Sequence, residues 1–166
     1  MILLLCFSCA VKKQLFQRQD IGFLLKKNIC ELSIPDDWTS FRDVHNFLFY
    51  TPKKLMRNND NNSVSVYRFT NIGEKTLEYV AEKEIELFNK NHNIKVENSE
   101  IKQSKFGKTI VFKINQYWES TKYIKELRFF KFLNSVYVFQ YMSIPTFFDF
   151  YLEDANSIYD SITIRK

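Results

Sequence analysis

Residues 108–143, "KTIVFKINQYWESTKYIKELRFFKFLNSVYVFQYMS", decide the fold of this chain. Stretches rich in β-branched and aromatic residues follow one another here, a composition typical of strands. They are separated at residues 119–122 and at Asn134-Ser135. Breaks of this length suit antiparallel neighbours, because a parallel return needs a crossover of about a dozen residues. A further strand candidate, residues 93–106, precedes them across Gly107. The segment therefore predicts an antiparallel meander.

Two other stretches change to helical spacing. In "TLEYVAEKEIELFNKN" (76–91) the apolar residues recur on one helical face, which predicts a helix over Thr76–Asn89 with Thr76 as its N-cap. In "IPTFFDFYLEDANSIYDS" (144–161) the same spacing predicts a helix over Thr146–Tyr159, with Thr146 and Asp149 in the positions of a capping box. Each helix is expected to lie with its apolar stripe on the sheet.

Shorter strands are predicted before the first helix. They are a strand over Cys30–Ile34 that stops at Pro35, "FLFYT" (47–51) and the alternating "SVSVYRFT" (63–70). The order of elements is then strands, helix, meander and helix. This order predicts an α+β domain in which an antiparallel sheet is flanked by helices.

At this point the residues resemble a known fold family. "IPDDW" (34–38) leaving a first strand, a helix after the third strand, long antiparallel strands and a last amphipathic helix are similar to the PsbP/Mog1-like fold over Ile29 to Ile164. The resemblance implies an α/β/α sandwich used for protein binding in photosystem subunits, a GTPase-release factor, small bacterial lipoproteins and secretion-effector chaperones. It brings no catalytic residue set.

The composition is that of an ordinary globular domain. Apolar residues make up 45% of the 166 residues and charged residues 26%, so the chain is not of the disordered class. The formal charge is +5, but no run of Lys and Arg exceeds two residues. Because nucleic-acid binding needs basic residues concentrated on one face, we expect no nucleic-acid partner.

The first residues, "MILLLCFSCAVKKQ" (1–14), resemble the end of a bacterial lipoprotein leader. The resemblance implies a diacylglyceryl group on the Cys9 thiol, with cleavage before that residue. The apolar run is too short to span a bilayer, which takes about 20 residues. We therefore expect a leader over residues 1–9, a tether over residues 10–28 and a single domain over residues 29–166. The alternative is that residues 1–9 form a buried first strand.

A candidate binding surface follows from aromatic and basic residues that alternate on adjacent predicted strands. Such interleaving offers stacking and charge to a partner, although core packing beneath two helices explains many of the same aromatics. The candidate residues are Trp118, Tyr123, Lys125, Arg128 and Tyr137.

Motifs for catalysis or for a bound cofactor are not found. The chain has only 3 Gly and no phosphate-cradling loop, and its 3 Cys include no pair with the partners that zinc requires. We expect no catalytic residues, no metal and no cofactor. His45 and His92 lack partners at ligand spacing, so a hydrolase built on either is the least favoured hypothesis.

These observations favour a non-enzymatic binding module that is anchored to a membrane of the bacterial cell envelope, on the periplasmic or surface side. Its expected partners are the membrane, through the lipid, and a protein. The alternative is a cytoplasmic protein-interaction or effector-chaperone domain of the same fold. The position of residues 1–28 relative to the domain distinguishes the two.

Overall fold

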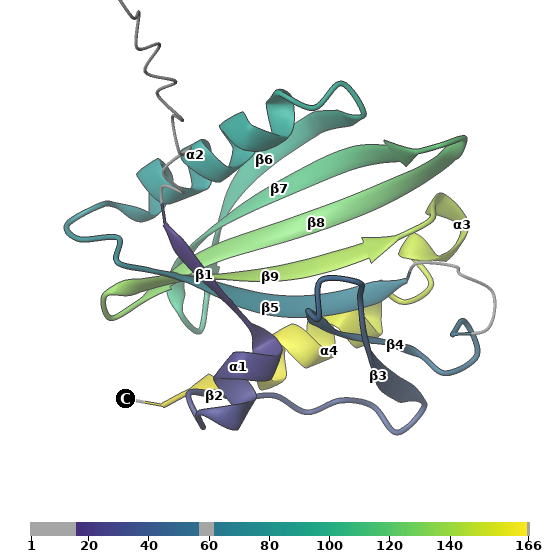
Figure 1. Cartoon of the computed structure of the whole chain (residues 1–166), viewed down its shortest axis with the longest axis horizontal. Coiled ribbons are helices and arrows are strands. Elements are labelled where there is room, and N and C mark those ends of the chain that lie inside the picture. The colour runs from purple at the N-terminus through teal and green to yellow at the C-terminus, as the bar shows by residue number, and fades with distance from the viewer. Residues whose placement is uncertain (1–15, 57–61, 166) are drawn as a thin grey trace, which may run out of the picture.

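A computed structural model of the chain describes residues 16–56 and 62–165, shown in Figure 1. The central feature is an eight-stranded antiparallel sheet with the strand order β3-β4-β5-β9-β8-β7-β6, in which β1 pairs with β5. β2 and β10 form a separate two-stranded sheet. The elements are β1 (Gln17–Asp20), α1 (Ile21–Lys26), β2 (Cys30–Glu31), β3 (Trp38–Arg42), β4 (Leu48–Pro52), β5 (Ser63–Thr70), α2 (Leu77–Asn89), β6 (Ile94–Ser104), β7 (Gly107–Trp118), β8 (Thr121–Phe132), β9 (Ser135–Ser143), α3 (Pro145–Phe148), α4 (Leu152–Ser161) and β10 (Thr163–Ile164).

The predicted meander is confirmed as β6 to β9, four consecutive antiparallel strands. Its turns use residues with positive φ, namely Gly107 at 84°, Glu119 at 52° and Leu133 at 51°. The last turn therefore places its left-handed residue one position before Asn134. Phe132 pairs with Ser135, which leaves Leu133 and Asn134 as the two residues of the turn.

Helices cover both faces of the sheet, as the predicted α+β class requires. α2 packs on the face that carries Tyr67, Leu127 and Phe129, which we call the α2 face. α4 packs on the opposite face, which carries Phe130, Tyr137 and Phe139 and which we call the α4 face. The predicted α2 is confirmed together with its cap, because the Thr76 hydroxyl accepts a hydrogen bond from the amide of Tyr79 at 3.2 Å.

The second predicted helix is interrupted, which corrects the span Thr146–Tyr159. α3 ends at Phe148 and α4 begins at Leu152. The Tyr141 hydroxyl donates to the carbonyl of Phe148 at 2.8 Å, and the amide of Leu152 turns to the carbonyl of Asp149 at 3.4 Å. The carbonyl of Phe148 thus accepts a hydrogen bond from a side chain of the sheet. In a continuous helix it would accept from the amide of Leu152. No side-chain cap forms on α3, so the predicted capping box of Thr146 and Asp149 is wrong.

The expected tether over residues 10–28 is also corrected where the structure describes it. Gln17–Asp20 pair with β5 as β1, and α1 follows at once. Ile21 and Leu24 of α1 are fully buried in the core of the α4 face. The domain therefore begins by Gln17, and residue 29 is not its start. Residues 1–15, which hold the predicted leader and the first part of the tether, lie outside the described residues.

The segment between α1 and β4 also differs from the strand that the sequence predicts there. The strand predicted at Cys30–Ile34 is limited to Cys30–Glu31, which pairs with β10 near the end of the chain. Trp38 begins a strand that sequence reasoning missed, β3, and β3 and β4 form a hairpin. The Trp38 indole is buried and donates to the Asp154 carboxylate of α4 at 3.3 Å. Among the described residues no helix has the length and apolarity needed to cross a membrane.

Candidate functional site

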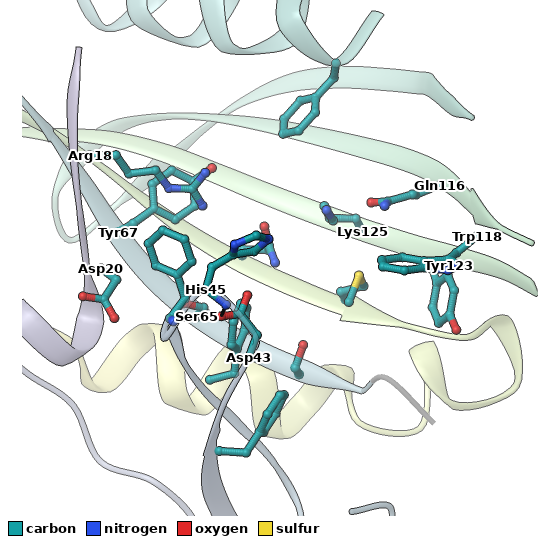
Figure 2. A pocket seen from close by; sticks show the side chains of 17 residues that line it. Arg18, Asp20, Asp43, His45, Ser65, Tyr67, Gln116, Trp118, Tyr123 and Lys125 are labelled. Atoms are coloured by element: carbon teal, nitrogen blue, oxygen red, sulfur yellow. Dashed lines mark hydrogen bonds between the residues drawn. The ribbon is translucent and has the colours of Figure 1, made fainter. Parts of the chain in front are cut away.

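The α2 face is covered unequally, and this leaves a cavity of about 380 Å³ beyond the C-terminal end of α2. Ser63, Ser65 and Tyr67 of β5, Lys125 of β8 and Gln140 of β9 line the cavity on the sheet side. β1 and the turn between β3 and β4 close its sides (Figure 2). We call this space the aromatic cavity.

Aromatic side chains from distant parts of the chain make its walls. Phe41 and Phe49 of the β3–β4 hairpin stack with ring centroids 5.4 Å apart. Phe88, in the last turn of α2, reaches the cavity from the opposite side. Trp118, at the end of β7, is 66% exposed and marks the mouth. The walls are therefore apolar and the mouth carries an aromatic side chain that is open to solvent.

The Lys125 ammonium is the unusual group of the cavity. Lys125 is only 9% exposed, and its Nζ lies 5.6 Å from the centroid of the Phe88 ring. Within the described residues the ammonium makes neither a hydrogen bond nor an ion pair. Burial, and then the neighbouring charge of Arg18, lower the pKa of Lys125 to about 8 against the weaker opposing effect of Glu84. Lys125 is thus a desolvated cation that has no paired anion in residues 16–56 and 62–165.

Arg18, the other cation of the cavity, is engaged by the protein. Its guanidinium lies 3.5 Å from the centroid of the Tyr67 ring, in a cation–π contact. Its Nη1 lies 4.0 Å from Oε1 of Glu84, an oxygen that also accepts from the Tyr67 hydroxyl at 3.4 Å. Burial is the main reason that the pKa of Glu84 is raised. Glu84 is thus engaged by Arg18 and Tyr67, and in the described part of the chain Lys125 has no ion-pair partner.

The carboxylates that line the cavity are held by backbone amides. The carboxylate of Asp20 caps α1 by accepting from the amide of Phe23 at 3.1 Å and also accepts from the amide of Leu48 at 3.1 Å. Asp43 Oδ1 accepts from the amides of His45 and Phe47 at 3.0 and 2.8 Å. Both side chains thus shape the chain around the cavity, and neither forms an ion pair with Lys125 among the described residues.

One neutral polar group in the cavity also lacks a hydrogen-bond partner among the described residues. The Oε1 atom of Gln116, on β7, is buried and has no hydrogen-bond partner among the described residues. A side-chain amide presents both an acceptor and two donors. Gln116 and Lys125 come from neighbouring strands of one sheet face, so a bound molecule would meet two polar groups without partners among the described residues, beside the aromatic walls.

Neither histidine side chain is paired with an acidic side chain in the described part of the chain, as the hydrolase hypothesis would require. His45 lies at the exposed turn between β3 and β4 and lines the cavity, whereas His92 is exposed in the loop after α2. In the described part of the chain neither imidazole is hydrogen-bonded to an acid, and no group of three or more His, Cys, Asp or Glu side chains is placed to hold a metal ion.

Comparison with known proteins rests on solved structures, because no protein-family model and no curated protein sequence matches the chain. LpqN, involved in cell envelope biogenesis of Mycobacterium tuberculosis, superposes with a TM-score of 0.62 at 12% identity, over 91% of this chain and 92% of that one. Cyanobacterial PsbP (CyanoP) from Synechocystis sp. PCC 6803 gives a TM-score of 0.60 at 11% identity, over 95% and 98%. The chain has the PsbP/Mog1-like fold. A protein of unknown function from Pseudomonas aeruginosa, PA94, gives 0.54 at 10% identity, over 78% and 98%.

In this PsbP/Mog1-like sheet the five predicted site residues divide between the two faces. Trp118, Tyr123 and Lys125 meet in the aromatic cavity. Arg128 lies on the α4 face, where its Nη2 pairs with Glu126 at 2.6 Å and donates to Asn156 of α4. Tyr137 is 2% exposed and stacks on Phe130 with centroids 5.7 Å apart.

The five residues therefore do not form one surface, because side chains alternate between the faces of a strand. Lys125 and Arg128 are an odd number of residues apart on β8, which is a signal that the sequence contains. Sequence reasoning missed Arg18, which it placed in the tether, and the aromatic residues of the β3–β4 hairpin. Contacts between distant parts of the chain bring these to the cavity.

Proposed function

We propose that this protein is a non-enzymatic binding module whose binding site is the aromatic cavity. The observation that carries the proposal is a cavity of about 380 Å³ with aromatic walls, which holds a desolvated Lys125 that has no ion-pair partner among the described residues. Cavities of about 300 to 1,000 Å³ with aromatic walls and few polar groups are typical of small-molecule sites. The similar fold of LpqN, which is involved in cell envelope biogenesis, supports placing this binding module in the cell envelope.

A neutral apolar probe tests whether the cavity binds ligands. N-phenyl-1-naphthylamine, followed by its fluorescence and by native mass spectrometry, is expected to bind once per chain. Trp118→Ala removes an exposed aromatic at the mouth and should weaken binding several-fold without loss of stability. Tyr117→Ala is the matched control, because Tyr117 is also exposed but belongs to the opposite face of β7. Wild-type protein that binds no probe would contradict the proposed function.

Membrane attachment through Cys9 is the second part of the proposal. Support comes from the leader-like sequence of residues 1–9 and from a domain that begins near Gln17, which leaves only a short connection to Cys9. In bacteria that express the full chain, Cys9→Ser is expected to move the protein from the membrane fraction to the soluble fraction. Cys6→Ser is the control and should stay with the membrane. An intact mass without a lipid on Cys9 would favour the cytoplasmic alternative.

The protein partner implied by the fold resemblance belongs to this proposal as well. Exposed Trp118 provides an aromatic contact at the mouth of the cavity, and Trp is enriched among residues that dominate protein interfaces. A membrane tether would place this mouth within reach of envelope proteins.

A further inference from the structure

We propose that the aromatic cavity binds a small organic anion with an apolar body, whose charged group contacts the Lys125 ammonium. This inference rests on the proposed function of the cavity as a binding site and names the chemical class of its ligand. The shared chemistry, a carboxylate or similar anion on an apolar body, fits both a fatty acyl chain and an aromatic acid.

The charge of the ligand follows from the balance of ionised groups around the cavity. Glu84 is engaged by Arg18 and Tyr67, and the carboxylates of Asp20 and Asp43 accept from backbone amides. Lys125 is therefore the cation left without a counter-ion in the described part of the site. Because a desolvated ion is costly unless it is paired, an anion supplied by a ligand is the group that the site lacks.

The apolar character of the ligand body is inferred from the side chains that form the cavity walls. Phe41, Phe49 and Phe88 offer ring faces and edges, and Met142 of β9 adds a flexible apolar side chain beside Lys125, its partner across the strands. The unpaired amide oxygen of Gln116 accepts one hydrogen bond from a ligand. A fully hydrated inorganic ion would leave these apolar surfaces uncovered, so an anion that carries an apolar body fits the cavity better.

The test uses two probes that differ by one anionic sulfonate group. 1-Anilinonaphthalene-8-sulfonate is the sulfonated form of N-phenyl-1-naphthylamine, so the ratio of the two affinities isolates the anionic group. Charge-assisted hydrogen bonds are strong enough that we expect Lys125→Met to weaken binding of the sulfonate about tenfold or more. The same variant should leave the neutral probe bound as before. Lys113→Met is the matched control, because it removes a positive charge from the opposite face of the neighbouring strand.

Each result decides between the two proposals. If Lys125→Met leaves sulfonate binding unchanged, or weakens both probes equally, the anion inference is overturned. If the wild type binds the neutral probe but not the sulfonate, the inference fails and the proposed function stands. If it binds neither probe, both fail. Displacement of the bound sulfonate by dodecanoate indicates a fatty acyl ligand, displacement by 2-naphthoate indicates an aromatic acid, and displacement by neither overturns the inference.

The unmodified protein supplies an independent measurement. Affinity for the sulfonate, which stays ionised, should fall as Lys125 loses its proton above about pH 8, and affinity for the neutral probe should not. Among the described residues, the other charged or titratable groups around Lys125 belong to Arg18, Asp20, Asp43, His45, Tyr67, Glu84 and Tyr123. His45→Gln should keep the same dependence on pH. An affinity for the sulfonate that is constant from pH 7 to pH 9.5 would contradict a role for Lys125.

Discussion

Removing the charge of Lys125 should make the protein more stable. The pKa of Lys125 is lowered from 10.5 to about 8, mainly by burial. At about 1.4 kcal/mol for each tenfold change in proton affinity, the native state at neutral pH carries about 3 kcal/mol of unfavourable free energy from this ammonium. Lys125→Met keeps an unbranched side chain of similar length and removes the charge. We expect a gain of about 2 to 3 kcal/mol in unfolding free energy at pH 7, or about 5 to 10 °C in Tm for a domain of this size.

The pH dependence of this gain identifies its cause. Between about pH 8 and 10.5 the unfolded Lys125 keeps its proton while the native one loses it, so the unfolded state binds more protons and wild-type stability rises with pH through this window. The advantage of Lys125→Met should shrink accordingly. Burial raises the pKa of Cys30 from 9.0 to about 12, which removes stability above pH 9. That loss is common to both proteins and disappears from their difference.

Urea unfolding at pH 7, 8, 9 and 10 measures the difference directly, provided that the m-value is equal in the two proteins. Lys113→Met should show no comparable gain, because the Lys113 side chain is less buried and lies on the opposite face. A variant Lys125→Met that is no more stable than the wild type at pH 7, or whose advantage stays constant to pH 10, would refute the argument that an unpaired buried charge occupies the cavity.

Three further outcomes test other parts of the structure. Ile158→Ala should cost about 2 to 5 kcal/mol in urea unfolding, because Ile158 is fully buried between α4 and the sheet; a negligible loss would place α4 in solvent. Asp20→Ala should cost about 1 to 2 kcal/mol, since its carboxylate caps α1 and also holds the amide of Leu48; a calorimetric Tm equal to that of the wild type would contradict this role. Arg128→Met should leave the affinity of the sulfonated probe unchanged, because Arg128 lies on the α4 face; a tenfold loss would show that the two faces are coupled.

Part of the candidate site was readable from the sequence. Trp118, Tyr123 and Lys125 were identified because aromatic and basic residues interleave on adjacent strands, and all line the cavity. Arg128 and Tyr137 were grouped with them wrongly. The two-residue repeat of a strand places Arg128 opposite Lys125, and the cross-strand pairing of Phe130 with Tyr137 places Tyr137 on the α4 face as well.

The sequence by itself determined the elements whose signals are local. Short breaks between long apolar runs specify antiparallel neighbours, so the meander β6 to β9 was predicted, and the spacing after Thr76 specified α2 with its cap. Such features depend on residues within one turn or one hairpin, and the sequence displays those residues side by side.

Only the tertiary structure decided the features that depend on contacts between distant segments. Gln17–Asp20 become a strand because the edge of β5 accepts them, and the second helix breaks because the Tyr141 hydroxyl binds the carbonyl of Phe148. The state of Lys125 is decided in the same way. Its burial depends on α2, on β1 and on the β3–β4 hairpin. Within the described residues it has no counter-ion, because Glu84 contacts Arg18 instead. A charge pattern along the chain cannot reveal this, because desolvation and pairing are set by what surrounds a group in space.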